Sequence, residues 1–236
     1  MMYYSASMNT LDESLTNAVK EGKLLESSLT NIRLLLAGTK SPIAREAVEE
    51  LASAGDWEEL NDRFYKTLAF GTGGLRGRTI GNIVTKAEEG NGGVNGRPEY
   101  PCVGTACMNY FNVGRAMRGL IIYVKKHVEA TDPGRKPRLV IGHDTRHFSR
   151  DFAEFCAKIG TDLGCDIYLF DSPRATPEVS FAIRELNADS GVVLTASHNP
   201  SHDNGFKAYF SDGAQLVPPH DKAVIAEVNS LTSEEY

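Results

Sequence analysis

The chain has 236 residues, a net charge of −6 at pH 7 and 41% hydrophobic residues. This length allows one large domain, or one domain with an extension, and the composition allows a sizeable buried core. The acidic balance argues against a general nucleic-acid-binding protein.

Neither membrane insertion nor secretion is indicated by the sequence. The longest apolar runs, such as residues 120–124, are far shorter than the ~20 residues that a bilayer-spanning helix needs. The N-terminus has no basic segment leading into an apolar one, so we expect no signal peptide. The four cysteines form no C-x-x-C pair and are expected to be buried, reduced thiols. We therefore expect a cytoplasmic protein without a membrane partner.

Residues 1–68 predict a helical N-terminal extension to a domain at 69–236. Apolar residues recur at helical spacing, as at Leu11, Leu15 and Val19. Ser41 and Pro42 predict an N-cap with proline in the first turn, and Asp56 with Glu59 predicts a capping box. This region has no evident catalytic cluster, so we expect it to serve only in packing.

Two glycine-rich segments follow the extension. Residues 70–77 (FGTGGLRG) match neither the dinucleotide-binding fingerprint nor the P-loop. Their backbone can approach an anion closely, with the guanidinium of Arg76 beside it for bidentate phosphate contact. Taken alone, the segment reads better as a glycine-rich turn with a solvated arginine. Residues 89–96 predict a mobile surface loop without a function.

The remaining chain predicts alternating helices and strands. We expect a long helix at 105–128, then strands at 139–141, 166–170 and 192–194. A helix is expected between each strand and the next. The first begins at its cap, Ser149, and ends at Gly164, and the second begins at Thr176 and Pro177. A hairpin at 205–217 and a helix at 221–228 complete the pattern. The fold class is α/β: a three-layer α/β/α domain whose mixed sheet is mostly parallel.

Polar loops follow all three predicted parallel strands. They are residues 142–146 (GHDTR), 171–177 (DSPRATP) and 195–200 (TASHNP). Ligands of open α/β sheets bind beyond the carboxyl ends of the strands, so these loops should converge on one edge. Pro200 prevents a helical continuation of the third loop and Gly205 allows a tight return. The pattern indicates a nucleophile at Ser197.

Other readings of these loops are weaker. His143 and His147 are four residues apart, as are His198 and His202, but both pairs lie in expected loops rather than on a helix, which disfavours a zinc site. Arg146 fits a structural ion pair with Asp144 as well as it fits a functional role. A Ser197–His198 hydrolase is disfavoured because adjacent side chains rarely aim at each other and no G-x-S-x-G elbow is present.

Residues 195–200 together with 204–207 (NGFK) resemble the active-site serine signature of the α-D-phosphohexomutases, the phosphoglucomutase/phosphomannomutase family. Residues 70–77 resemble the glycine–arginine motif of that family, and residues 142–146 resemble its third loop. The helical lead-in at 57–70 is similar to the longer branch of the family, which includes phosphopentomutase-like members. The three motifs stand in the family's order along the chain.

The resemblance implies a phosphosugar mutase acting through phosphoserine at Ser197. The enzyme would move a phosphoryl group between the 1- and 6- (or 5-) positions of a sugar phosphate through a bisphosphate intermediate. A Mg²⁺ ion bound by the Ser197 phosphate would offset the charge of the transferring group. A sugar 1,6-bisphosphate would serve as activator, and Lys207 would transfer a proton with the sugar hydroxyl.

The resemblance also implies roles for the neighbours of the serine. Arg76 would lie beside the phosphoserine, where it would act in catalysis and in phosphate binding. His198 would orient the loop as part of the catalytic set. Asn199, Arg146 and Thr195 would help to bind the phosphate.

The family resemblance covers only the first of four domains. We therefore expect the chain to be the N-terminal part of a longer enzyme, whose remaining domains would be its partners and would supply the other metal ligands. Alone, it should be inactive or nearly so. The alternatives are a stand-alone serine phosphotransferase or hydrolase domain, and a non-catalytic phosphosugar-binding module.

Overall fold

A mixed five-stranded sheet forms the centre of the molecule. The computed structural model describes residues 3–71 and 73–233, with side chains from Thr10 onward, so Thr72 of the glycine-rich motif lies outside the described residues. The sheet order within these ranges is β1-β5-β4-β2-β3. The strands are β1 (Gly74–Arg78), β2 (Arg138–His143), β3 (Asp166–Leu169), β4 (Ser190–Leu194) and β5 (Asp203–Phe210).

Strand direction brings the loops of interest to one edge. β2 is parallel to both β3 and β4, whereas β5 is antiparallel to both β4 and β1. Among the described strands only β5 is therefore reversed, which confirms a mixed sheet with mostly parallel directions. The carboxyl ends of β1 to β4 and the start of β5 share the same edge.

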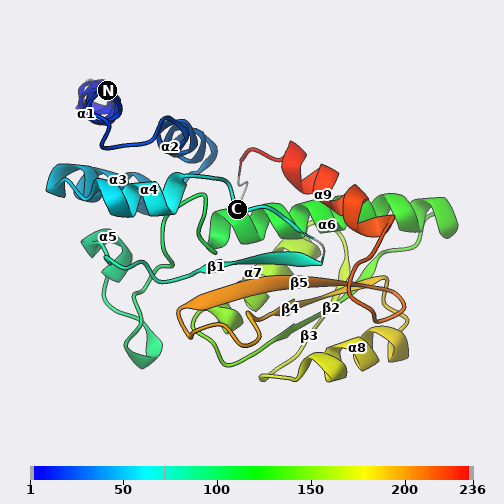
Figure 1. Ribbon diagram of the computed structural model, residues 1–236. Helices are drawn as coiled ribbons and strands as arrows, with labels where there is room; N and C mark the ends of the chain where they lie inside the picture. Colours follow the sequence, from blue (N-terminus) through cyan, green and yellow to red (C-terminus); the bar gives the residue numbers. More distant parts are fainter. Residues whose placement is uncertain (1–2, 72, 234–236) are drawn as a thin grey trace.

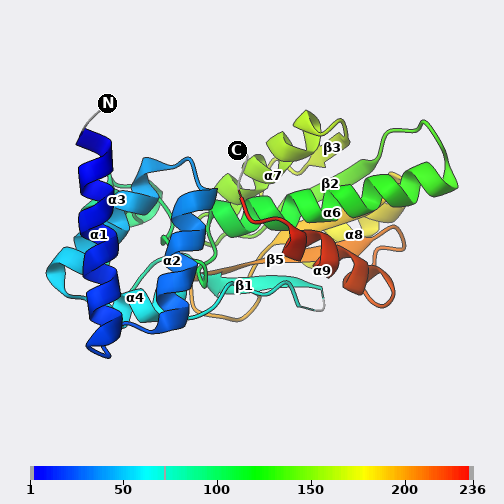
Figure 2. The same ribbon diagram turned by 90° about the horizontal axis from the view of Figure 1, so that it is seen from above.

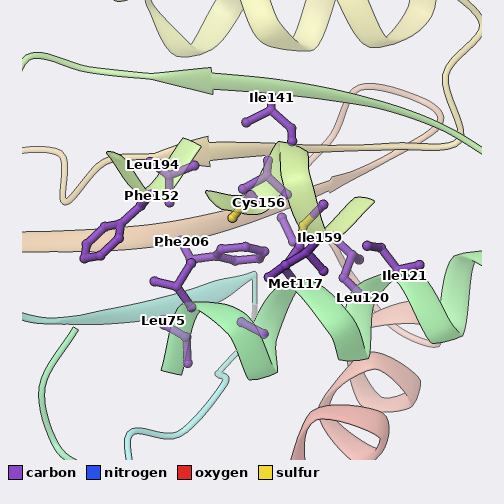
Figure 3. Packing of buried hydrophobic residues seen from close by; sticks show 14 of the residues in the cluster. Leu75, Met117, Leu120, Ile121, Ile141, Phe152, Cys156, Ile159, Leu194 and Phe206 are labelled. Atoms are coloured by element: carbon purple, nitrogen blue, oxygen red, sulfur yellow. The ribbon is translucent and has the colours of Figure 1, made fainter. Parts of the chain in front are cut away.

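Helices cover both faces of the sheet, which confirms the three-layer α/β/α architecture (Figure 1). One face carries α6 (Tyr110–Thr131), α7 (Ser149–Asp162) and α9 (His220–Ser230), and the other carries α8 (Thr176–Glu185). In the larger core, Phe206 of β5 and Leu194 of β4 pack with Met117 of α6 and Ile159 of α7 (Figure 3). Burial of these apolar side chains is the main force that holds the layers together.

Four N-terminal helices form a second, smaller core beside the sheet (Figure 2). They are α1 (Tyr3–Lys20), α2 (Glu26–Gly38), α3 (Pro42–Ala54) and α4 (Trp57–Phe64). Val103 and Phe111 join this core, so it packs against the segment that leads into α6. Two short elements, α5 (Lys86–Glu89) and a 3₁₀ turn (Val94–Gly96), lie in the connection from β1 to α6. No helix in the described ranges is long and apolar enough to span a membrane.

The helix-end predictions were partly wrong. Pro42 does open α3, and Gly164 with φ of 81° follows α7. The Asp56–Glu59 capping box does not form, because the Glu59 carboxylate instead accepts a 2.8 Å hydrogen bond from Arg63 in the interior. Ser149 lies in the first turn of α7 rather than at its cap, because its hydroxyl is engaged elsewhere in the fold.

Two other elements differ from expectation. The helix predicted at 105–128 begins at Tyr110, because the Asn109 side chain caps it by accepting a hydrogen bond from the amide of Asn112. The return arm of the hairpin at 214–217 is reduced to a single bridge between Tyr209 and Gln215. Beside β4, β5 has a second antiparallel neighbour, β1, in the segment that was predicted as a glycine-rich turn.

Candidate active site

The serine loop connects β4 to β5 at the common edge of the sheet. Ser197 is exposed and adopts a φ of 60°, a left-handed conformation that is uncommon for a residue other than glycine. Its amide donates a 3.0 Å hydrogen bond to Oγ1 of the buried Thr195, and the amide of Asn199 donates to the carbonyl of Ala196. These local bonds hold Ser197 at the tip of a tight turn, which is the sort of strained position often found at functional sites.

Arg146, from the loop after β2, holds the serine loop in shape. Its Nη2 donates to the carbonyls of Ser197 at 2.7 Å and Asn199 at 2.5 Å. Its Nη1 donates to those of Pro200 at 2.5 Å and Asp203 at 3.2 Å. One planar guanidinium thus satisfies four loop carbonyls, which a point-charge ammonium could not do.

Asp144 orients Arg146 in turn. Its Oδ2 lies 3.3 Å from Nε of Arg146, and its Oδ1 accepts hydrogen bonds from the Arg146 amide and the Ser149 hydroxyl. Every N–H of the guanidinium therefore faces a protein oxygen. The direct phosphate contact predicted for Arg146 stays a prediction, whereas its contact with the serine loop is present.

Arg76 and Lys207 project from the same face of the sheet next to this loop. Arg76 stands opposite Gly205 across the β1–β5 pair, two residues before Lys207 on β5. Burial, followed by the positive charge of Arg76, lowers the pKa of Lys207, and the negative charge of Asp144 partly opposes this. Neither cationic side chain forms a hydrogen bond to the described residues, so both are available to an anion.

The glycines of residues 70–77 have a different role from the predicted one. A Cβ on Gly74 would lie 1.7 Å from the carbonyl oxygen of Phe206, and one on Gly205 would lie 2.5 Å from that of Thr195. These glycines let two strands and the serine loop come close together. The second half of the motif forms part of strand β1, which places Arg76 at the edge of the sheet where Ser197 lies.

The other predicted side chains lie at the same edge with different surroundings. Asn199 donates from Nδ2 to Oδ2 of Asp203 at 2.9 Å, which links the two ends of the loop. His198 is exposed and forms no hydrogen bond to Ser197 or to any other described residue. Arg174, which was not among the predicted site residues, lies in the loop after β3, bonds mainly within that loop and reaches β2 through its amide.

Sequence reasoning missed two contributions. Asn204 is fully buried and bonds the carbonyl of His147 and the hydroxyl of Ser149, so it ties the start of β5 to α7. In the sequence, only the position of Asn204 in the run 204–207 (NGFK) indicated a role for it. Lys66, just after α4, lines a polar cavity beside the serine loop, although the helical extension was expected to serve only in packing.

The residues present do not by themselves form a cage for a metal ion. No cluster of three or more His, Cys, Asp or Glu side chains suited to a metal occurs among the residues that the structure describes. The carboxylate of Asp144, in the loop after β2, is committed to Arg146 and Ser149, and that of Asp203 accepts a hydrogen bond from Asn199. Ligands for Mg²⁺ other than a phosphate on Ser197 would have to come from elsewhere.

A family model described as phosphoglucomutase/phosphomannomutase, alpha/beta/alpha domain I, matches residues 86–235. The chain is 36% identical to a probable phosphoribomutase of Schizosaccharomyces pombe over 182 residues, 77% of the chain and 27% of that protein. It is 38% identical to a phosphoglucomutase of Staphylococcus epidermidis over 67% of the chain and 24% of that protein.

Among solved structures, a putative phosphomannomutase from Thermus thermophilus matches with a TM-score of 0.50 and 25% identity. The match covers 72% of this chain and 32% of that one. The chain spans 27% of the length of the relative from Schizosaccharomyces pombe and 24% of that from Staphylococcus epidermidis.

Proposed function

Since the chain belongs to the phosphoglucomutase/phosphomannomutase family and contains its first α/β/α domain, we propose that it supplies the phosphorylated nucleophile of a phosphosugar mutase, Ser197. The reaction moves a phosphoryl group between the 1-position and the 6- or 5-position of a sugar phosphate. The observation that carries the proposal is the placement of an exposed Ser197, on a loop held by Arg146, at the edge where Arg76 and Lys207 project.

In the proposed reaction, the bond between phosphorus and Oγ of Ser197 breaks and a bond to a sugar hydroxyl forms. The Lys207 amine takes the proton of that hydroxyl, and a proton returns to Oγ of Ser197. The lowered pKa of Lys207 supports this role, because it increases the fraction of neutral amine that can accept a proton. The bisphosphate then reorients and returns its other phosphoryl group to Ser197.

Arg76 acts as the main cation at the phosphoserine in this proposal. Its guanidinium is exposed and has no carboxylate partner among the described residues, so it can bind phosphate oxygens in a bidentate manner. Thr195, Asn199 and Arg146 keep the loop in the conformation that presents Ser197. His198 stays a predicted orienting group.

Several parts of the proposal reach beyond this chain. Mg²⁺, when bound to the Ser197 phosphate, neutralises charge on the transferring group, and its other ligands belong to further domains of a longer polypeptide. A sugar 1,6-bisphosphate is the activator that phosphorylates Ser197. The sugar itself is selected by parts outside these residues, so we expect the chain alone to turn over little or no substrate.

Peptide mass spectrometry tests the proposal on the natural polypeptide that contains this chain. After incubation with glucose 1,6-bisphosphate and Mg²⁺, phosphate should appear on Ser197. Ser197→Ala should remove both the phosphate and mutase turnover, whereas Ser201→Ala, an exposed serine in the same loop, should keep both. Full turnover by Ser197→Ala, or phosphate on Ser201 instead, would refute the proposal.

A further inference from the structure

A polar cavity of about 290 Å³ lies between the helical extension and the serine loop. Its volume is near the lower end of the range for small-molecule sites. Its walls come from the end of α4, from β1 and from the serine loop, and include Asp62, Tyr65, Lys66, Arg76, Asn199 and Asp203. Arg76 and Asn199 therefore border both this cavity and the predicted phosphoserine site.

Both acidic side chains in the wall are already committed. Asp62 forms an ion pair with Nη2 of Arg78, and Asp203 accepts the hydrogen bond from Asn199. The ion pair offsets the charge of Asp62, whereas Asp203 keeps its negative charge, because its partner amide is neutral. The wall therefore presents less free negative charge than its composition implies.

Two cationic side chains in the wall, those of Lys66 and Arg76, have no carboxylate partner among the described residues. Lys66 is exposed, with its ammonium 4.8 Å from the ring centroid of Tyr65, and it pairs with no carboxylate of the described residues. Arg76 is also exposed and unpaired. Arg78, by contrast, is paired with Asp62, and its buried Nη1 lies 3.9 Å from Oε1 of Glu59. Of the cationic side chains of the wall, Lys66 and Arg76 are thus left without a carboxylate partner in the described ranges.

We propose that this cavity binds a phosphate ester of the substrate between Lys66 and Arg76. Lys66 is then a substrate-binding residue that the helical extension contributes to the site on the α/β domain. An ammonium and a guanidinium on residues that line one polar space suit a phosphate group, since each forms charge-assisted hydrogen bonds to its oxygens. The inference rests on the proposed mutase function for the identity of the ligand.

Equilibrium binding tests this without relying on catalysis. The Ser197→Ala variant of the chain cannot be phosphorylated there, so binding of inorganic phosphate and of glucose 1-phosphate can be measured by calorimetry and by lysine-selective NMR. The Lys66 ammonium signal should shift on addition of either ligand. Adding Lys66→Met should weaken binding of both about tenfold, the usual scale of a lost charge-assisted contact.

The control is Lys40→Met, which removes another exposed lysine and should change binding less than about twofold. Circular dichroism confirms that both variants stay folded. Unchanged affinity in Lys66→Met, no binding of either ligand, or equal binding of uncharged glucose overturns the inference. Failure of the mutase proposal has a different signature, the absence of phosphate on Ser197 in the natural polypeptide.

Discussion

Replacing Arg146 with methionine should release the serine loop. The side chain of Arg146 is 13% exposed and its two terminal nitrogens donate four hydrogen bonds to loop carbonyls. Methionine keeps much of the aliphatic volume and removes all the donors. The loop carbonyls regain water when the loop opens, so the change should act on local opening more than on the fold as a whole.

The size of the effect follows from the number of contacts. A hydrogen bond from a charged donor contributes about 1.5–3 kcal/mol, but partial resolvation of the exposed carbonyls and shared geometry reduce the sum. We expect the free energy of loop opening to fall by about 2–4 kcal/mol. At about 1.4 kcal/mol per factor of ten, opening becomes about 30 to 700 times more frequent.

Amide hydrogen exchange measures this directly. The amides of Ser197, Asn199 and Asp203 all donate within the loop and should lose protection together in Arg146→Met. In Arg146→Lys, the protection of these amides should lie between that of the unchanged protein and that of Arg146→Met, because a single ammonium cannot reach all four carbonyls.

The matched control is Arg45→Met, which breaks one partly exposed pair with Glu49 at 3.4 Å and should cost about 0.5 kcal/mol or less. Loop protection that stays unchanged in Arg146→Met would refute the assignment of Arg146 as the residue that holds the loop.

Two more predictions concern charge in the fold. An NMR titration should find the pKa of Lys207 below that of a free lysine; Arg76→Gln should raise it and Asp144→Asn should lower it further, because the two charges act on it with opposite signs. The pKa of Lys207 is lower in the folded than in the unfolded chain, so charged Lys207 destabilises the fold. This destabilisation should be largest at pH values below the folded pKa and should disappear as the pH rises above the unfolded pKa. A Lys207 pKa that neither substitution changes would contradict the position of Lys207 near Arg76 and Asp144. Glu88→Gln should cost about 1.5–3 kcal/mol of unfolding free energy in urea, because the fully buried Arg63 loses its closest carboxylate, 2.5 Å away, and keeps only that of Glu59 at 2.8 Å; a loss below about 0.5 kcal/mol would show that this pair does not hold the fold.

Local sequence determined the α/β domain and the place of Ser197, the proposed nucleophile, at the edge of the sheet. Short apolar runs identify the strands, because a strand that is buried on both faces of a sheet needs apolar side chains on both sides. Between these runs, apolar residues at helical spacing identify the helices. Parallel neighbours then force the loops after the strands to one edge, so the neighbourhood of Ser197 could be inferred without coordinates. The mixed sheet and its three layers followed from the same reasoning.

Tertiary structure decided the parts whose partners are distant in the chain. β1 is rich in glycine and has no strand propensity of its own, so it becomes a strand only by pairing with β5, where Gly74 stands opposite Lys207. Ser149 looked like a helix cap, but its hydroxyl bonds Asp144 instead. Arg146 finds its acceptors more than 50 residues away, and no local pattern encodes that. Periodicity reports which face of an element is buried, whereas the partner of a polar group depends on how the whole chain packs.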